Sequence, residues 1–490
     1  MLYISAQPDD IYFIWQLEIL LRNLRELGVT MRKTHILVGY KRNIGLNPVF
    51  KAFIDENKDL AEFYCYPDTR KNPQYVSSIR PHILKKHFNK YPELSNAIFM
   101  YHDSDILFSR IPQILPDNKC YVSDTRSYLD VNYILKCSSE DLLNEMLDVV
   151  GLSREKLKFE NHNTGGAQYI LKGITSKFWE KVESDCEKLF SIMTAYNFNL
   201  WDREYKSKKE LRNNRRGIHA WCADMWAILW NLWFFGHEVK IHPELAFNWP
   251  FSPSKLWNSR TILHYTGGIG DGSLYFKKSN YINYFPWYDE NLDSISKDSC
   301  SYFVAQHIKK RRFELDNSRP TFKNSIIILK CKLPTMETDI LFSTYKKYIQ
   351  KYLDITVVHI IDVCETEFID EKIPRRENLT SITSRFSTYL IIPLDQLLDS
   401  EQILLILNDM TIDKALIPMG GYVLDALFIK LFSNLLDTRF FDENKGKFQL
   451  TSETLPILHL GTRNMELYLN DEASLFGLEK QNFGCVYKLN

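Results

Sequence analysis

The chain has 490 residues, of which 45% are apolar and 25% are charged, so a large hydrophobic core can form and wholesale disorder is excluded. Lys and Arg together number 61, as do Asp and Glu, and the formal net charge is zero. The sequence therefore predicts no broad basic surface for a nucleic acid or an anionic membrane. At roughly 100–200 residues per domain, this length predicts two to four domains.

The sequence contains no run of about eighteen apolar residues, so we expect no membrane span. It begins with a strand-like run, Met1–Ser5, and lacks the basic and then apolar pattern of a signal peptide. The nine cysteines are odd in number and form no C-x-x-C pair, which favours reduced thiols. These features predict a cytoplasmic protein.

The first part of the chain predicts a β-α-β unit. Met1–Ser5 and His35–Gly39 have the composition of buried strands, and apolar residues recur between them at helical spacing from Ile14 to Leu24. Gly28 is expected to end that helix. A β-α-β pattern implies a parallel sheet, and Ala97–Tyr101 is predicted to be its third strand.

Further elements are expected on both sides of a linker at residues 317–323. Helices are predicted at Ser139–Val150 and Ser176–Tyr196, and a glycine turn leads into a strand at Asn161–Leu171. We expect a first domain over residues 1–316 and a smaller α/β domain over residues 323–490. Its predicted elements are a strand from Ser325, a helix at Asp339–Leu353, and strands at Ile355–Ile361, Thr388–Leu394 and Lys414–Pro418.

The strongest chemical signal is the acid pair Asp103 and Asp105, which follows the strand Ala97–Tyr101. Ligands of open α/β sheets bind beyond the carboxyl ends of strands, so both carboxylates are expected in that crevice. Two acids one residue apart can share Mg²⁺ or Mn²⁺, and the same ion can bridge a diphosphate. The alternative is a solvated turn, because D-x-D tripeptides often occur by chance.

A second signal is His264, at the end of a predicted strand and just before the glycine-rich run Gly267–Gly272. Imidazole suits Mn²⁺, and glycines such as Gly267 let backbone amides approach phosphate oxygens. The alternative is a packed core histidine, but the glycine run favours a loop that faces a ligand. We therefore expect Asp103, Asp105 and His264 to hold one metal ion.

This arrangement resembles the GT-A glycosyltransferases, which hold a metal and a nucleotide sugar with a D-x-D motif and often a late histidine. The likeness extends to the plant hydroxyproline arabinosyltransferases and peptidyl-serine galactosyltransferases, through Tyr12–Gln16, Asp224-Met225 and His264–Thr266. It covers roughly residues 1–290 and implies a GT-A (Rossmann-like) fold. The Lys-Pro-Trp that follows the histidine motif in glycogenin-like enzymes is absent, which leaves a lysine contact with the diphosphate open.

The resemblance implies a hexosyl- or pentosyltransferase that uses Mn²⁺ or Mg²⁺ and a nucleotide sugar, most simply a UDP-sugar. Arg80 has planar hydrogen-bond donors suited to a phosphate or a sugar hydroxyl. For Tyr40, the alternative interpretation is an ordinary surface tyrosine. Gly165 and Gly166 match a turn beside the donor sugar, with a plain tight turn as the alternative. The expected donor-binding residues are Ala6, Gln7, Tyr40, Arg80, Asp103, Ser104, Gly165, Gly166 and Gly267.

The segment from Trp221 to Trp233 has helical spacing, with Trp226, Trp230 and Trp233 on one side that we expect in the core. Asp224 lies on another side and could act as a general base on an acceptor hydroxyl, or bind a sugar. Trp221 and Trp249 are expected to stack on sugar rings of the acceptor.

The second half of the chain repeats parts of these motifs. Tyr389–Asp395 resembles the approach to the D-x-D motif, but Pro393 replaces the first acid, and Ile457–Gly461 resembles the strand that ends at His264. A degenerate copy of the first domain is therefore expected, without catalysis. Its expected role is acceptor binding or homo-oligomerisation.

The sequence thus favours a glycosyltransferase acting on a glycan or peptide hydroxyl, and two other classes stay open. Haloacid-dehalogenase-like phosphotransferases also use an acid pair after a strand, although Leu107 occupies their Thr or Val position. A non-catalytic carbohydrate-binding or scaffolding protein would use the tryptophan-rich region without turnover.

Overall fold

The computed structural model describes residues 1–114, 117–208, 216–266, 274–282, 285–287, 289–318, 321–331 and 336–361, and short segments between 388 and 488. Its contacts divide the chain into two units. Unit 1 comprises residues 1–282 and 290–308, and unit 2 comprises residues 283–289 and 309–490. The boundary predicted at residues 316–323 stays a prediction. No helix of the described residues is long and apolar enough to cross a membrane.

Unit 1 is built on a seven-stranded sheet in the order β3-β2-β1-β4-β7-β6-β8. The pairs β1–β2, β2–β3, β1–β4 and β6–β8 are parallel, whereas β7 runs antiparallel to both β4 and β6. This mixed α/β architecture with a mostly parallel central sheet confirms the predicted fold class. The strands are β1 (Leu2–Pro8), β2 (Thr34–Lys41), β3 (Glu62–Asp68), β4 (Phe99–Tyr101), β6 (Cys120–Asp124), β7 (Gly165–Leu171) and β8 (Val239–Ile241).

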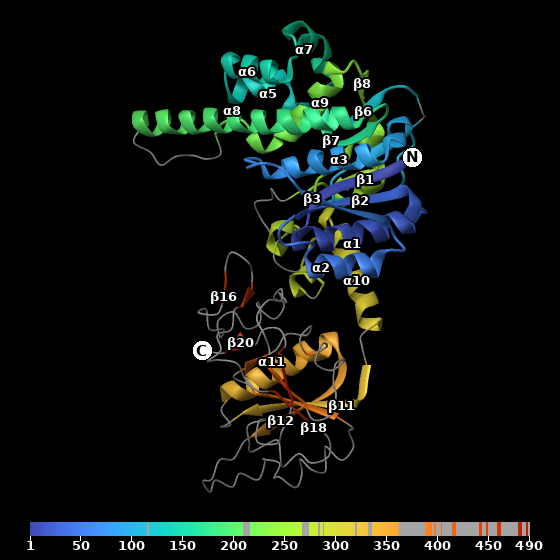
Figure 1. Ribbon diagram of the computed structural model, residues 1–490, viewed down its shortest axis with the longest axis vertical. Coiled ribbons are helices and arrows are strands. Elements are labelled where there is room, and N and C mark those ends of the chain that lie inside the picture. The colour runs from blue at the N-terminus through green and yellow to red at the C-terminus, as the bar shows by residue number, and fades with distance from the viewer. Residues whose placement is uncertain are drawn as a thin grey trace. The chain divides into compact units, whose positions relative to one another are not determined.

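Helices cover both faces of this sheet (Figure 1). Alternate residues of β1 serve the two sides, since Ile4 packs in the cluster with α3, α8 and α9, and Tyr3 packs in the cluster with α1. The helices are α1 (Ile11–Glu26), α2 (Pro48–Asn57), α3 (Ile79–Lys90), α4 (Arg126–Leu129), α5 (Val131–Cys137), α6 (Glu140–Val150), α7 (Arg154–Glu160), α8 (Ser176–Lys208), α9 (Ala223–Phe234) and α10 (Ser301–Asn317).

A small second sheet carries the elements that matter most for function. It has the order β5-β10-β9, with β5 (Ile106–Phe108), β9 (Phe247–Asn248) and β10 (Ile262–His264). The core residues of these strands pack with Leu20 and Leu24 of α1. The chain leaves the central sheet at the end of β4 and enters the small sheet at β5, and Asp103–Asp105 is the connection.

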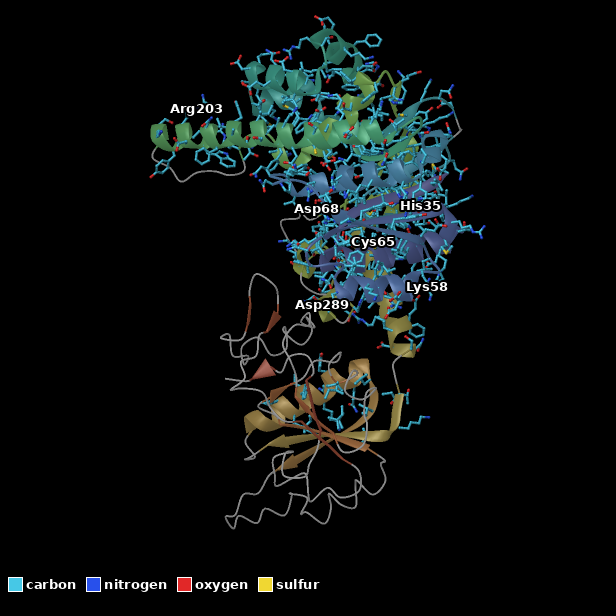
Figure 2. The ribbon with its side chains drawn as sticks, viewed as in Figure 1. His35, Lys58, Cys65, Asp68, Arg203 and Asp289 are labelled. Atoms are coloured by element: carbon cyan, nitrogen blue, oxygen red, sulfur yellow. The ribbon has the colours of Figure 1, made fainter. Side chains whose placement is uncertain are left out.

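Several elements differ from the sequence prediction. The sequence analysis did not predict strand β3, an edge strand in which only Tyr66 is buried and whose short apolar run ends at Pro67. Helix α8 continues from the predicted Tyr196 to Lys208, and its last turns near Arg203 project from unit 1 (Figure 1; Figure 2). The predicted linker residues Thr321–Lys323 belong to a strand instead.

The predicted tryptophan core is confirmed. Trp226, Trp230 and Trp233 of α9 are at most 2% exposed and belong to the main hydrophobic cluster with α3 and α8. Burying three such side chains fixes α9 against the sheet, at roughly 1.5–3 kcal/mol for each large apolar group. The first turn of α9, which contains Asp224, is thereby held in a fixed position.

Unit 2 contains a six-stranded sheet in the order β12-β11-β13-β18-β15-β19. Helix α11 (Met336–Tyr352) connects its first two strands, as α1 does in unit 1. The strands are β11 (Thr321–Cys331), β12 (Asp354–Ile361), β13 (Thr388–Pro393), β15 (Lys414–Ile417), β18 (Leu458–Gly461) and β19 (Glu479–Asn482); the short strands β14 (Gln396–Leu397), β16 (Phe441–Asp442), β17 (Lys447–Phe448) and β20 (Tyr487–Lys488) lie outside this sheet.

Apart from β3, the two sheets have the same strand order and the same pattern of parallel and antiparallel neighbours. Strand β11 is parallel to β12 and β13, β18 is antiparallel to β13 and β15, and β15 is parallel to β19. Complete rows of paired residues cross both sheets. In unit 1 one row runs through His35, Ile4, Tyr101, Tyr169, Val122 and Ile241, and a second through Thr34, Tyr3, Met100, Ile170, Tyr121 and Lys240. In unit 2 a row runs through Val358, Ile328, Ile391, His459, Ala415 and Lys480.

This match corrects one sequence expectation. Ile457–Gly461 was likened to the strand of His264, but β18 pairs with β13 as β7 pairs with β4. The strand of His264, β10, lies in the separate small sheet. The three-residue likeness around His459 therefore reflects a common apolar strand pattern and no shared position.

Candidate metal and donor site

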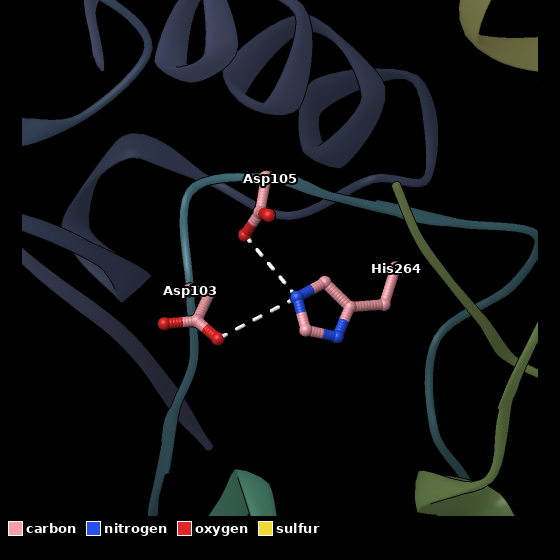
Figure 3. A group of neighbouring side chains, drawn as sticks. All are labelled: Asp103, Asp105 and His264. Atoms are coloured by element: carbon pink, nitrogen blue, oxygen red, sulfur yellow. Dashed lines mark ion pairs between the residues drawn. The ribbon is translucent and has the colours of Figure 1, made fainter. Parts of the chain in front are cut away.

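Asp103, Asp105 and His264 converge on one point, as the sequence predicted (Figure 3). The Nε2 atom of His264 lies 3.7 Å from Oδ2 of Asp103 and 3.4 Å from Oδ1 of Asp105. The sequence places these residues together because β10 pairs antiparallel with β5, so His264 at the end of β10 lies opposite Ile106 at the start of β5. The backbone amide of Tyr265 also donates to the carbonyl of Asp105 at 3.0 Å.

Each carboxylate uses its other oxygen to pair with a cation. Arg80 of α3 donates to Oδ1 of Asp103 at 2.6 Å, and the ammonium group of Lys278 pairs with Oδ2 of Asp105. The two remaining oxygens both face the imidazole. The cations therefore orient the carboxylates and leave one oxygen of each directed at the same point.

The electrostatics keep Asp105 ionised. Burial would raise the pKa of Asp105, but Lys278 and His264 outweigh burial and hold the pKa well below its usual range. For His264, burial lowers the pKa, but Asp105 raises it by a larger amount, so the net shift is an increase. The pKa of Lys278 is likewise raised by Asp105 against the effect of burial.

The three side chains fit a divalent cation. Their ligand atoms lie within 4.8 Å of one another. Neighbouring ligands of an octahedral ion at about 2.1 Å are about 3 Å apart, so small side-chain shifts would complete the geometry. Two carboxylate oxygens and one imidazole nitrogen form a donor set that suits Mn²⁺ or Mg²⁺.

A cavity of about 510 Å³ opens beside this cluster. It lies beyond the carboxyl ends of β1 and β4, where ligands of α/β sheets usually bind. Its described walls include residues of α1, the D-x-D connection, β7, α9 and the small sheet. The predicted site residues that line it are Ala6, Arg80, Asp103, Ser104, Asp105, Trp221, Asp224, Trp249 and His264.

Asp224 is buried in this wall and belongs to a polar chain that reaches the metal site. Tyr75 donates to Oδ1 of Asp224 at 2.7 Å, and Arg80 lies 3.4 Å from its other oxygen. Burial raises the pKa of Asp224, and Arg80 opposes this only in part. Arg80 therefore bridges Asp103 and Asp224.

Three of the predicted donor-binding residues lie near the carboxyl ends of β1 and β2, and their surroundings differ. Ala6 lines the cavity, whereas Gln7 and Tyr40 are not among the described residues that do so. The amide of Gln7 is used inside the sheet, since it donates to the carbonyl of Leu37 at 2.7 Å and accepts from Ser5 at 3.0 Å. Ser104 lines the cavity and donates to Gln16 of α1 at 3.1 Å.

Gly165 and Gly166 are not among the residues that line the cavity, and they precede Ala167, which is. A Cβ atom on Gly165 would come within 2.3 Å of the carbonyl oxygen of Ser123, so this glycine permits close packing of β7 on β6. A Cβ on Gly166 would meet the hydroxyl of Tyr169 at 2.8 Å. Ala167, with a left-handed φ of 69°, is the residue that lines the cavity. Gly267 lies outside the described residues.

The two predicted tryptophans both line the cavity, in different settings. Trp221, in the short 3₁₀ helix η5 (Ala220–Cys222), is 61% exposed and stacks on His219. Trp249 is half-buried and stacks on His264.

Sequence reasoning missed two residues that contact site residues directly. Lys278 lies in the 3₁₀ helix η8 (Lys278–Tyr281) and pairs with Asp105. Residues 267–273 separate it from His264 in the sequence, and no motif of fixed spacing connects the two residues. Tyr75 lies just before α3, and only the fold brings its hydroxyl to Asp224. No local pattern marks either residue.

Comparisons with known proteins give structural matches only. No family model and no curated protein matches the sequence. Solved structures that match include WbbM, a bifunctional glycosyltransferase (9% identity, TM-score 0.33, 63% of this chain and 51% of that one), so the match spans about half of WbbM. An active-site mutant of LgtC matches with 12% identity and TM-score 0.31 over 64% of this chain and 96% of that one.

A third match is mouse xyloside xylosyltransferase 1, with 8% identity and TM-score 0.28 over 55% of this chain and 99% of that one. Because these TM-scores are low, we base the proposed function on the geometry of the site alone.

Proposed function

We propose that the chain is a GT-A glycosyltransferase that moves a sugar from a nucleotide sugar, most simply a UDP-sugar, to a hydroxyl group of a glycan or peptide. The observation that carries this proposal is the convergence of Asp103, Asp105 and His264 at the mouth of a cavity of about 510 Å³. A cavity of that volume suits a nucleotide-sized ligand. The bound cation, Mn²⁺ or Mg²⁺, would neutralise charge on the diphosphate leaving group.

The residues around the cation have separate tasks in this proposal. Lys278 and Arg80 hold the two carboxylates, and both cations lie close enough to the site to attract a diphosphate. In this proposal Lys278 takes the role of the lysine in the Lys-Pro-Trp motif, which this sequence lacks. Ser104 and Ala6 lie along the donor side of the cavity.

Asp224 is the proposed catalytic residue. Its burial raises its pKa, which suits a carboxylate that accepts a proton from an acceptor hydroxyl. Tyr75 and Arg80 fix both of its oxygens, so the carboxylate faces the cavity in one orientation. In this scheme the acceptor oxygen loses its proton to Asp224 as the sugar leaves the diphosphate.

Hydrolysis of the donor in the absence of acceptor tests the proposal. A panel of nucleotide sugars with Mn²⁺ should give release of nucleoside diphosphate from at least one donor, and Asp105→Asn should abolish it. Arg126→Lys, in an exposed pair with Asp124, serves as the control. Absence of turnover with every donor, in the presence of each metal, would contradict the proposal.

The phosphotransferase alternative is disfavoured by Leu107. This residue is fully buried in β5 and pairs with Leu263, so its position offers no hydroxyl to a phosphate. Because Asp103 is paired with Arg80 and faces His264, it is arranged as a ligand and is poorly placed as a free nucleophile.

We also propose that unit 2 is a degenerate copy of unit 1. The shared strand order and the complete rows of paired residues support this proposal. With Tyr389–Asp395 aligned on the D-x-D motif, Ile391 corresponds to Tyr101 and Pro393 takes the place of Asp103, and both Tyr101 and Ile391 lie in complete rows of paired residues. We therefore expect one metal ion per chain, held in unit 1.

A further inference from the structure

The ring of Trp249 lies nearly parallel to two other aromatic rings. The ring of His264 lies 6.0 Å away at an interplanar angle of 20°, and the ring of Phe251 lies 6.2 Å away at 7°. Phe247 contacts both Trp249 and His264 edge-on, at 4.9 Å and 5.3 Å. Trp249 is therefore half-buried and packed among three protein rings, one of which is the imidazole of His264.

His264 depends on this packing for its orientation. Its Nε2 faces the two carboxylates, whereas its buried Nδ1 has no hydrogen-bond partner in the described part of the chain. A metal-binding histidine is usually oriented by a hydrogen bond from its second nitrogen. Here the stacking on Trp249 and the edge contact with Phe247 orient the imidazole ring of His264 instead.

Trp221 differs in both respects. It is 61% exposed although it lines the cavity, and within the described part of the chain its ring stacks on that of His219, at 5.7 Å and 30°. Its backbone is held in place, because the hydroxyl oxygen of Tyr75 lies 2.6 Å from its carbonyl oxygen and 2.7 Å from Oδ1 of Asp224. An exposed indole beside the proposed base suits the apolar face of a sugar ring.

From this difference we propose that the two tryptophans have different roles. Trp221 is the platform for a saccharide acceptor, and Trp249 is a positioning residue that holds His264 in the orientation required for the metal. The inference rests on the proposed function and goes beyond it, because it names a saccharide as the acceptor class and assigns Trp249 to the support of His264.

The metal part is tested with the full chain and Mn²⁺ alone, by titration monitored with electron paramagnetic resonance. Trp249→Leu should weaken Mn²⁺ binding by about 10–100-fold, the range for residues that orient metal ligands. Trp249→Phe, which keeps an aromatic face, should recover most of the affinity, and Trp221→Leu should leave it unchanged. Equal Mn²⁺ affinity in wild type and Trp249→Leu would overturn the positioning role.

The acceptor part is tested by saturation-transfer NMR with lactose, cellobiose and xylobiose, in the presence of UDP and Mn²⁺. Wild type and Trp249→Phe should both show transfer to at least one disaccharide, and Trp221→Leu should lose it. Transfer that persists in Trp221→Leu, or no transfer in the wild type, would overturn the platform. Thermal melts of each variant show whether it is folded.

These outcomes separate this inference from the proposed function. The Mn²⁺ titration needs no turnover, so a wild type that binds Mn²⁺ through the Trp249-supported histidine but hydrolyses no donor would sustain the positioning role and contradict the glycosyltransferase. An active enzyme whose Trp249→Leu variant retains full Mn²⁺ affinity would do the reverse.

Discussion

The guanidinium group of Arg80 donates a hydrogen bond to Asp103 at 2.6 Å, and its other nitrogen lies 3.4 Å from Asp224. One side chain therefore connects the metal site to the proposed base. Burial lowers the pKa of Arg80, but Asp224 and Asp103 outweigh it, so the guanidinium stays charged. Its positive charge opposes in part the rise that burial causes in the pKa of Asp224.

Replacing Arg80 with lysine should weaken both functions at once. A single ammonium cannot contact two carboxylates in the way a planar guanidinium does. We expect Arg80→Lys to lower Mn²⁺ affinity and kcat, each by about tenfold or more. Calorimetric titration and donor hydrolysis measure the two effects, with Arg126→Lys as the matched control. A variant with a changed kcat and unchanged Mn²⁺ affinity would show that the bridge is not needed for the metal site.

Asp224→Asn should remove activity while preserving or raising stability. Because burial raises the pKa of Asp224 in the folded state, the ionised carboxylate costs folding free energy above that pKa. The cost disappears below the ordinary carboxyl pKa of about 4, where both states are protonated. We expect kcat to fall by about 10²–10⁴-fold and the Tm at pH 7 to match or exceed that of the wild type. A large loss of Tm at pH 7 that persists at pH 3 would contradict this account.

Tyr75→Phe tests whether the Tyr75 hydroxyl orients Asp224, and it is a milder change than replacing Asp224 itself. The change removes one hydroxyl that lies within hydrogen-bond distance of both Asp224 and the Trp221 carbonyl. A hydrogen bond to a charged group contributes about 1.5–3 kcal/mol, which corresponds to roughly a 10–100-fold loss if it is expressed fully in kcat. Tyr121→Phe, in an exposed pair with Asp117, is the control for loss of a phenol. If Tyr75→Phe reacts at the wild-type rate, the hydroxyl does not orient the base.

Acid should destabilise unit 1 through His87. This histidine is buried and forms hydrogen bonds with Tyr66 at 2.8 Å and with His35 at 3.2 Å. Burial lowers its pKa to about 3. The unfolded chain takes up a proton near pH 6.5 that the folded state resists, so stability falls as pH drops from about 6.5 towards 3.

The measurement is the free energy of unfolding from urea titrations between pH 7.5 and 4.5. His87→Gln should reduce the slope, by at most about 1.4 kcal/mol per pH unit. Part of the slope should remain, because the pKa values of His35 and His102 are also lowered by burial. An unchanged slope in His87→Gln would show that another group causes the acid sensitivity.

Local patterns predicted much of the fold and singled out the three residues that cluster at the end of β4, Asp103, Asp105 and His264. The strand before Asp103 and the glycine-rich run after His264 are short-range signals, and the pairing of β5 with β10 then brings the three residues together. The sequence could not place Lys278 or Tyr75, because their contacts depend on segments far apart in the chain. It also could not separate Trp221 from Trp249, since only the folded chain shows what covers each ring.

The central claim is that Asp103, Asp105 and His264 bind one divalent cation, and calorimetric titration of the full chain with Mn²⁺ in the presence of UDP tests it most directly. We expect one Mn²⁺ per wild-type chain, and loss of that site in Asp105→Asn and in His264→Ala, with Arg126→Lys unchanged. Equal Mn²⁺ binding by wild type and by both ligand variants would contradict the account.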